Sequence, residues 1–279
     1  MNRRERAQYT IRVLREVIPR PQSELHFKNE YELLVAVVLS AQCTDARVNV
    51  VTPAFFEAYP TLRSLAAAEP EDVYPIIKSI SYPNQKAKHL VNAARKIVSE
   101  FGGRIPDTHD ELVSLPGVGR KTAQVMLAVA FDKAALAVDT HVFRVANRIG
   151  ITEDANTPYK VEQQLKEVIP QDEWGEAHHL LILHGRYTCT ARNPKHDKCP
   201  VQPVCQYYQR LQAIPAPRKG LDPEKGAYYC KSRRHYFDEP DTRTDEYGVE
   251  QIACPRCGST NVFETKTGKS TKRVPDYRI

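Results

Sequence analysis

Apolar residues recur every three to four positions from Arg3 to about Arg210, which is the periodicity of amphipathic helices. The helical segments run for about 10 to 16 residues, and prolines and glycines separate them. One segment, Tyr31 to Gln42, is apolar on nearly every side and follows a capping pair of Asn29 and Glu32. We therefore predict a helical body without strands, built around a buried helix at 31–42.

Two further helix starts carry local signals. Thr108 with Glu111 repeats the capping pair ahead of an apolar segment. Thr157 precedes Pro158, which places a cap residue before a proline at the first helical position. We expect helices to begin at both places.

The pattern changes after Tyr208. Residues 215–220, Pro-Ala-Pro-Arg-Lys-Gly, are typical of a linker, and the polar stretch beyond contains short strand-like pieces at 249–253 and 261–265. We therefore predict a linker and a small C-terminal extension over residues 213–279.

Composition excludes several classes of protein. Of the 279 residues, 41% are hydrophobic and 27% are charged, as in ordinary soluble proteins. The longest apolar run, Leu33 to Leu39, is far shorter than the roughly 18 residues of a membrane span. The charged first residues lead into no apolar signal segment, which argues against secretion. The net charge of +6 permits a phosphate-rich partner without proving one.

The cysteines suggest metal binding. There are seven, an odd number, and most follow residue 188, so metal ligation in a reducing compartment is a better interpretation than a disulfide framework. Cys43, at the end of the apolar helix, is interpreted as a core thiol.

The most informative stretch runs from Leu115 to Ala123, Leu-Pro-Gly-Val-Gly-Arg-Lys-Thr-Ala. Gly117 and Gly119 permit positive φ angles and expose backbone N–H groups beside a helix N-terminus, which is a phosphate-binding arrangement; a plain glycine-rich turn is the alternative. Lys121 falls in the first helical turn, where the helix dipole disfavours a cation. It is either the charge partner of a phosphate or a nucleophilic amine.

Asp139 precedes the next apolar helix. It can be an N-cap, and capping leaves its second oxygen free. A carboxylate near an amine nucleophile could stabilise a sugar cation and move protons.

The hairpin at Leu115–Lys121 and the sequence Val138-Asp139-Thr140-His141 resemble the helix-hairpin-helix DNA glycosylases of the endonuclease III family. The similarity covers about residues 5–210, including Leu39–Asp45, Lys86-Ala87, His184–Arg186 and the cysteine cluster. It implies an all-α, two-lobed fold with DNA across the cleft between the lobes. One lobe would comprise residues 1–24 and 136–212 with the cluster loop, and the other residues 25–135 with the hairpin.

The resemblance implies a bifunctional DNA glycosylase and AP lyase of base excision repair. Lys121 would attack C1′ of a flipped nucleotide and release an oxidised pyrimidine, and β-elimination would follow 3′ to the lesion. Asp139 would stabilise the oxocarbenium charge. We expect a monomer without a membrane partner that acts on duplex DNA with a damaged pyrimidine or an abasic site, in the nucleoid region of a bacterial cytoplasm.

The resemblance also implies DNA contacts by Gln42, Tyr82, Gly117, Gly119, Arg120 and Lys121. Flipping a base leaves a hole in the duplex. Gln42 would meet the orphan base and Tyr82 would act as a wedge, where the family often has an aliphatic residue. A polar helix end and an exposed turn aromatic are the respective alternatives.

Three other residues match positions of the family's cleft. Ser40 and Asp45 would line it, with caps or core hydrogen bonds as the alternative. His141 is interpreted as a histidine packed near the active-site helix.

The family holds a four-iron four-sulfur cluster with the pattern C-x6-C-x2-C-x5-C. Here the four positions are Cys189, His196, Cys199 and Cys205, so a histidine replaces the second cysteine. Three interpretations stay open: a cluster with His196 as a ligand or nearby, a structural zinc ion, and an empty loop. The neighbouring Arg186, Arg192, Lys195 and Lys198 suit a phosphate-facing loop or a solvated surface.

The C-terminal extension carries a second set of candidate ligands. Cys254 and Cys257 have the spacing of half a zinc ribbon, and Cys230 with His235 would complete four ligands. Free thiols or the remnant of a lost site are the alternatives. An auxiliary DNA contact and protein docking both remain open for this module.

Two rival functions are a DNA-binding protein without catalysis and a metal-dependent phosphodiesterase. The first has no need for Lys121 together with Asp139. The second would need clustered carboxylates, of which the sequence shows no sign.

Overall fold

The computed structural model describes residues 1–216, 218–245, 248–275 and 277. Its helices are α1 (Arg3–Val17), α2 (Glu30–Ser40), α3 (Asp45–Ala58), α4 (Leu62–Ala66), α5 (Pro70–Ile77), α6 (Pro83–Glu100), α7 (His109–Val113), α8 (Arg120–Val129), α9 (Thr140–Ile149), α10 (Pro158–Val168), α11 (Trp174–Tyr187) and α12 (Gln206–Gln212). Its strands are β1 (Tyr228–Cys230), β2 (His235–Phe237), β3 (Asp241–Thr244), β4 (Glu250–Ala253) and β5 (Val262–Glu264). Short 3-10 turns lie at Gln171–Glu173, His196–Lys198, Gln202–Val204 and Pro223–Lys225.

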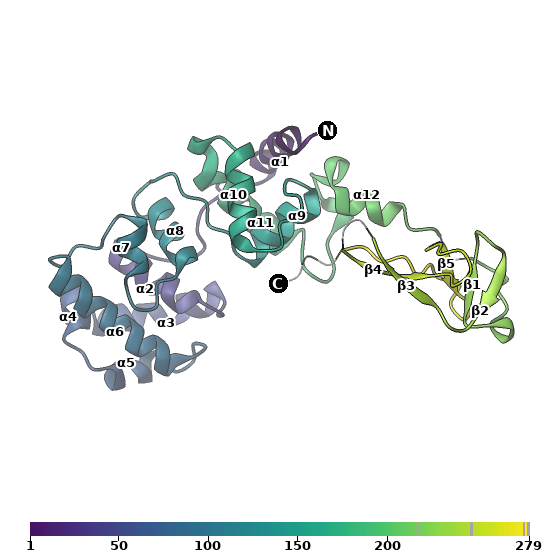
Figure 1. The fold of residues 1–279 in the computed structure, drawn as a ribbon. Helices are drawn as coiled ribbons and strands as arrows, with labels where there is room; N and C mark the ends of the chain where they lie inside the picture. Colours follow the sequence, from purple (N-terminus) through teal and green to yellow (C-terminus); the bar gives the residue numbers. More distant parts are fainter. Residues whose placement is uncertain (217, 246–247, 276, 278–279) are drawn as a thin grey trace.

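The helical body consists of two lobes (Figure 1). Buried apolar residues between Leu25 and Ala135 form one core, which α2–α8 enclose. Residues of α1, α9, α10 and α11 and of the loop 189–205 form the second core. Since α1 packs against α10 and α11, the start of the chain belongs to the lobe built from the end of the body.

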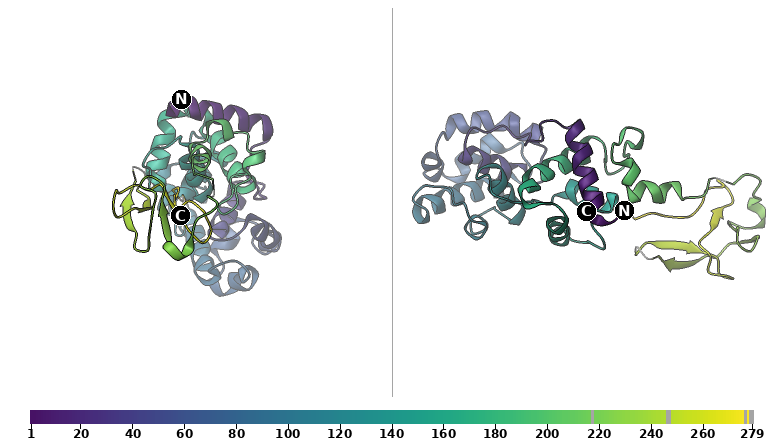
Figure 2. Two further views of the ribbon diagram at one scale, coloured as in Figure 1. Left: turned by 90° about the vertical axis from the view of Figure 1, so that its right-hand side faces the viewer. Right: turned by 90° about the horizontal axis from the view of Figure 1, so that it is seen from above.

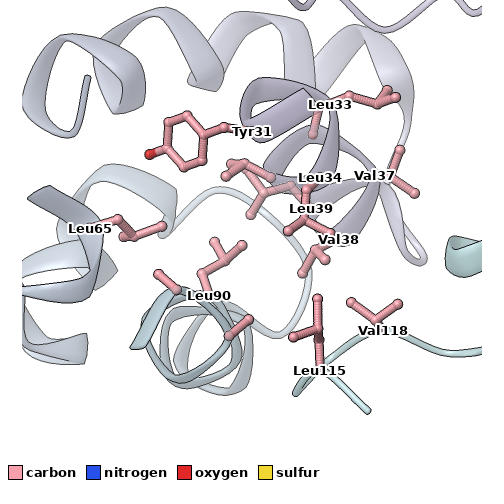
Figure 3. Packing of buried hydrophobic residues seen from close by; sticks show 14 of the residues in the cluster. Tyr31, Leu33, Leu34, Val37, Val38, Leu39, Leu65, Leu90, Leu115 and Val118 are labelled. Carbon is pink, nitrogen blue, oxygen red and sulfur yellow. The ribbon is translucent and has the colours of Figure 1, made fainter. Parts of the chain in front are cut away.

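The helix α2 is the centre of the first lobe. Its residues from Leu33 to Leu39 are all buried, and Figure 3 shows Leu34, Val38 and Leu39 on the side toward Leu65, Leu90 and Leu115 of neighbouring segments. The helix was predicted to extend to Gln42 but ends at Ser40. The reason lies in its last turn, where the buried Lys86 ammonium donates to the carbonyls of Leu39 at 2.8 Å and Ala41 at 2.6 Å.

Local capping signals place most of the predicted helix starts. Asn29 accepts a hydrogen bond from the Glu32 amide at 2.9 Å, and Thr157 accepts one from the Lys160 amide at 3.2 Å. Thr108 is also an N-cap by position, but its hydroxyl donates to the Glu111 carboxylate at 2.6 Å and caps no backbone amide.

The C-terminal module is a small β structure beyond α12 (Figures 1 and 2). One antiparallel sheet has the order β2-β1-β5, and β3 pairs with β4. The predicted strand-like pieces are present as β4 and β5, while β1, β2 and β3 were not predicted. Within the predicted linker, Pro217 lies outside the described residues, and the Arg218 amide donates to the Gly268 carbonyl at 2.7 Å.

Candidate active site and metal centres

A pocket lies between the two lobes. Lys121 of α8 lines it from the first lobe, and Asp139 at the start of α9 lines it from the second. Its other lining residues include Glu24, Ser40, Asp45, His178, His179 and Arg186. The two residues expected to carry the chemistry thus face the same space, although 18 positions separate them in the sequence.

Lys121 lies in the first turn of α8, directly after the hairpin. Its side chain is exposed, and within the described part of the chain it has no hydrogen bond or ion pair. Its amine is therefore available to a ligand in the pocket.

Asp139 is the N-cap of α9. Its Oδ1 accepts hydrogen bonds from the amides of His141 at 2.9 Å and Val142 at 2.8 Å. These two bonds fix the carboxylate, and its second oxygen takes no part in them. The capping role and a chemical role are therefore compatible here.

His178 is a buried residue that lines the pocket. Burial, and after it the neighbouring His179, lower the pKa of His178 to about 4, so the ring is neutral near pH 7. Its Nδ1 lies 2.7 Å from the Ala137 carbonyl oxygen. Because a carbonyl oxygen can only accept a hydrogen bond, Nδ1 carries the proton of the neutral ring and donates it. This residue was missed in the sequence, because a histidine pair on an apolar helix carries no signal of its own.

An ion-pair group lines the pocket and connects the lobes. Arg186 of α11 pairs with Asp45 of α3 at 2.6 Å and with Glu24 in the connection between α1 and α2. Burial would raise the pKa of Glu24, but hydrogen bonds from Tyr187 and Arg186 hold that pKa below its ordinary value. Arg186 and Asp45, which the sequence suggested separately, thus belong to one group.

The remaining cleft candidates have packing contacts. The Ser40 hydroxyl donates to the Val37 carbonyl at 2.8 Å and borders the pocket. Burial lowers the pKa of His141, whose ring nitrogen lies 3.2 Å from the Arg144 guanidinium. Both contacts agree with the packing alternatives.

The two glycines of the hairpin differ. Gly117 has φ +79°, and a Cβ there would lie 2.8 Å from the His89 Cβ, so this position needs glycine. Gly119 was expected to share a positive φ, but it is extended at φ −94°. Among the residues that the structure describes, a Cβ on Gly119 would meet nothing within 4 Å, and no side chain caps the helix that starts there. The open helix N-terminus therefore presents free N–H groups, as the phosphate-binding interpretation requires.

Arg120, an expected DNA contact, forms contacts within the protein. Its guanidinium donates to both carboxylate oxygens of Glu162 in α10, each at 2.9 Å, and lies 4.9 Å from the Tyr159 ring centre. Lys166 also donates to Glu162, at 2.7 Å. Burial would raise the pKa of Glu162, but hydrogen bonds from Arg120 and Lys166 hold it below its ordinary value. The Arg120 side chain therefore connects the two lobes.

Gln42 and Tyr82 lie on neighbouring loops in unusual backbone conformations. Both have φ +54°, in the left-handed region that residues other than glycine seldom adopt. The Ser81 hydroxyl donates to the Gln42 carbonyl at 2.7 Å, which joins the two loops, and Tyr82 is 61% exposed. Strained residues of this kind concentrate at functional sites.

The cluster loop surrounds a small cavity, which Cys189, His196, Cys199 and Cys205 all line. His184 lines it too, with Nε2 3.7 Å from the Cys199 Sγ. Burial raises the pKa of Cys199 to about 12, and the Arg148 guanidinium lies 3.6 Å from the Cys189 Sγ. Among the described residues, no three of these ligand atoms lie within 4.8 Å of one another. The donors are too far apart for one zinc ion and suit a larger group.

The candidate ligands of the C-terminal module are packed more tightly. The ligand atoms of Cys230, His235 and Cys254 all lie within 4.8 Å of one another. Cys257 Sγ lies 3.8 Å from Cys230 Sγ, and His235 Nε2 lies 3.6 Å from Cys254 Sγ. Thiolates bound to one tetrahedral zinc lie about 3.8 Å apart, given Zn–S bonds of about 2.3 Å.

Comparison with known proteins agrees with this arrangement. Residues 35–171 match the HhH-GPD superfamily base excision DNA repair proteins, and residues 189–205 match the iron-sulfur binding domain of endonuclease III. Endonuclease III of Rickettsia felis is 46% identical over 190 residues, which are 68% of this chain and 89% of that protein. Endonuclease III of Escherichia coli K12 is 40% identical over 211 residues, which are 76% and 99% of the two chains. The chain belongs to the endonuclease III family.

A solved structure of this family supports the fold. A trapped endonuclease III–DNA covalent intermediate with an estranged adenine superposes with a TM-score of 0.73 at 39% identity, and covers 76% of this chain and all of that one. The two-lobed, all-α fold expected for residues 5–210 is thus confirmed, as is iron–sulfur binding by the loop. The family matches end at residue 205, so the C-terminal module lies outside them. No helix among the described residues has the length and apolar character to cross a membrane.

Proposed function

We propose that this member of the endonuclease III family is a bifunctional DNA glycosylase and AP lyase. It removes oxidised pyrimidines from duplex DNA and then cleaves the strand 3′ to the abasic site by β-elimination. It acts as a monomer on DNA in the bacterial cytoplasm. The observation that carries the proposal is the single pocket between the lobes into which both Lys121 and Asp139 open.

The reaction begins with Lys121 as the nucleophile. Its neutral Nζ attacks C1′ of the flipped nucleotide, and the bond from C1′ to the damaged base breaks, with the electron pair leaving on the base. The free oxygen of Asp139 stabilises the positive charge that develops on the sugar and accepts the amine's proton.

The second half of the reaction cleaves the strand. The sugar ring opens to give a Schiff base between Nζ and C1′. Loss of a C2′ proton then expels the 3′ phosphate as the C3′–O bond breaks, and water hydrolyses the imine to release Lys121. These steps need only the lysine amine, a carboxylate and water.

The surrounding elements hold the substrate in this proposal. The open N-terminus of α8 after Gly119 binds a phosphate, and Gly117 shapes the turn. The joined loops of Gln42 and Tyr82 fill the hole in the duplex. The backbone of Arg120 belongs to the phosphate site, while its side chain supports the lobes.

The experiment is borohydride trapping on a duplex with one thymine glycol, with an abasic duplex in parallel. A covalent adduct on both duplexes that is absent in Lys121→Ala supports the proposal. Adduct on the abasic duplex alone means that the lesion is a different one. No adduct on either duplex, with DNA binding intact, would favour a non-catalytic DNA-binding protein.

We also propose that Cys189, His196, Cys199 and Cys205 hold a four-iron four-sulfur cluster. The cavity that all four line and their wide separation support this ligand set. His196 packs against Tyr207 and Tyr208, with ring centres 6.0 and 5.1 Å apart, which fixes the ring beside the cavity. Histidine ligation raises the reduction potential of iron–sulfur centres.

Two variants test the histidine ligand. His196→Cys restores four cysteines and should retain full iron and sulfide content with a lower reduction potential, whereas His196→Ala should lose iron. Full iron content and an unchanged potential in both variants would show that His196 is no ligand. Loss of iron in His184→Gln but not in His196→Ala would identify His184, and not His196, as the histidine ligand.

For the C-terminal module we propose a structural zinc ion held by Cys230, His235, Cys254 and Cys257. The short distances between these ligand atoms support it. Metal analysis of the purified protein should give one zinc per chain, and Cys254→Ser should remove it without loss of iron. Zinc that persists in Cys254→Ser would contradict this assignment.

A further inference from the structure

The C-terminal module carries a concentration of unpaired cations around its metal-ligand group. The ligands lie on two short turns, residues 230–235 and 254–258, which together contain Lys231, Arg233, Arg234 and Arg256 and no acidic residue. All four cationic side chains are exposed. Among the described residues none of the four forms an ion pair, so their charges face solvent uncompensated.

Direct contacts hold these two turns together. The Ser232 and Ser259 hydroxyls lie 2.8 Å apart, and the Lys231 amide donates to the Asn261 carbonyl at 3.1 Å. Cys230 Sγ and Cys257 Sγ lie 3.8 Å apart. The four cations therefore form one surface, which we call the cationic knuckle.

A fifth cation adjoins the cationic knuckle. The exposed Arg243 of β3 lies over Gly258, where an added Cβ would be 2.2 Å from the guanidinium carbon. The opposite end of the sheet is different, because residues 218–225 and 264–269 mix lysines with Asp222, Glu224 and Glu264. The exposed Asp241 of β3, which pairs with Ala253 beside the second turn, is an acidic residue at the ligand end as well. Five cations lie there, and positive charge therefore predominates at this end of the module.

We propose that the cationic knuckle is a second DNA-binding surface, which contacts duplex phosphates outside the segment that the two helical lobes hold. This rests on the proposed function, in which duplex DNA is the substrate. Clustered, exposed Arg and Lys side chains with a neighbouring serine are the usual donors to phosphate oxygens. The module follows α12 on the side of the molecule away from the hairpin lobe (Figure 1), so its contacts fall on flanking DNA.

The knuckle variant combines Lys231→Gln, Arg233→Gln, Arg234→Asn and Arg256→Gln. Asparagine is used at residue 234 because its φ of +54° is one that asparagine tolerates. A matched control changes Lys219, Lys225, Lys266 and Lys269 to Gln, which removes the same charge from exposed positions elsewhere in the module. Both are made in the full chain with Lys121→Ala, so that the thymine glycol duplex is bound and not cleaved.

Affinity is measured over a series of salt concentrations, with zinc content determined for each protein. The knuckle variant should bind about tenfold more weakly at about 0.1 M salt, and the slope of log affinity against log salt should fall by about 0.9 for each phosphate that the variant no longer binds. The control variant should keep the slope of the parent protein.

Unchanged affinity and slope in the knuckle variant would overturn the proposal. Such a result would favour an acidic protein as the partner of this surface. An equal loss in the control would overturn it too, since the effect would then come from net charge alone. If the knuckle variant lost zinc, Arg243→Gln with Arg256→Gln would be measured in the same way, because this pair leaves the turn from Cys230 to His235 intact.

The failure of this proposal can be distinguished from a failure of the proposed function. Borohydride trapping by the protein with Lys121 intact tests the chemistry, and the salt series in the Lys121→Ala background tests the surface. A trapped adduct together with an unaltered salt dependence would contradict only the proposal that the cationic knuckle binds DNA.

Discussion

Two neighbouring regions at the boundary between the lobes each contain a cation, and only one of these cations has partners within the described residues. On one side of the α8 start, Arg120 donates twice to Glu162 and stacks on Tyr159. On the other side, Lys121 opens into the pocket beside Asp139 and has no partner among the described residues. One cation is part of the structure, while the next residue is left available.

This difference shows where the chain gives up local stability. A lysine in the first turn of a helix opposes the helix dipole by roughly 0.3 to 1 kcal/mol. Such a violation of a local rule, without a compensating contact, is expected at functional sites. Arg120 also lies in the first turn, where the helix dipole disfavours a cation, but its ion pair with Glu162 offsets this unfavourable interaction. Partner contacts therefore separate a cation that is part of the structure from one that is available to a ligand, which residue type alone does not.

Lys121→Ala tests the unpartnered cation and should have the largest effect. Strand cleavage should fall by about three orders of magnitude or more, because the nucleophile is gone, while DNA affinity should stay within a few-fold. Gel assays of cleavage and binding measure both quantities. Cleavage equal to that of the unmodified protein would remove Lys121 from its assigned role.

Asp139→Asn should have the next largest effect. Asparagine caps a helix as well as aspartate, so the melting temperature should hardly change, but the loss of negative charge should slow base release by about 10²-fold or more. Single-turnover kinetics and thermal unfolding separate the two effects. A normal rate in a stable variant would reduce Asp139 to a helix cap.

Arg120→Ala tests the other side of the comparison. Glu162 is buried and, among the described residues, would keep only Lys166. The Arg120 side chain is half-exposed, so losing its hydrogen bonds to this carboxylate should lower the free energy of unfolding by about 2 kcal/mol. Arg120→Lys, which keeps the charge without the two parallel bonds, should lose less. Lower DNA affinity at unchanged stability would instead make the Arg120 side chain a DNA contact.

The smallest expected effect is the dependence of the unfolding free energy on acidic pH, which Glu162→Gln should change. Hydrogen bonds hold the pKa of Glu162 below its ordinary 4.5 in the folded protein. The carboxylate's contribution is therefore complete above pH 4.5 and is lost as the pH falls through the lower folded value. The unfolding free energies of the unmodified protein and Glu162→Gln should differ by a constant amount from pH 7 to pH 5, and the gap should narrow below pH 4.5. A gap that narrows at higher pH would contradict the lowered pKa.

Features with local causes could be predicted from the sequence. The buried helix α2 and the cap at Asn29 follow from adjacent residues, and the structure confirms both. The strands β4 and β5 were found for the same reason. The family's fold was recognised from the hairpin and from the Asp139 sequence, which have distinctive residue types at fixed spacing.

Features that depend on distant residues could not be predicted. Arg120 and Glu162 are 42 positions apart, and Arg186 and Glu24 are 162 apart, so no local pattern links either pair. Gly119 has an extended backbone where composition suggested positive φ, since glycine permits that conformation without requiring it. The roles of Gln42 and Tyr82 in DNA stay predictions.

The two candidate metal-ligand groups show the same limit. Each combines three cysteines with one histidine, and the sequence alone allowed zinc in both. Only the distances between ligand atoms distinguish the widely spaced group at 189–205 from the compact group of the C-terminal module, whose spacing suits a single ion.

The most direct test of the central claim is to identify the amine that the reaction modifies. The borohydride-trapped complex would be digested with nuclease and protease, and the peptide that retains the sugar remnant would be sequenced by mass spectrometry. We predict the remnant on the Nζ of Lys121. A remnant on another lysine or on the N-terminal amine would contradict the assignment of the pocket between the lobes as the active site.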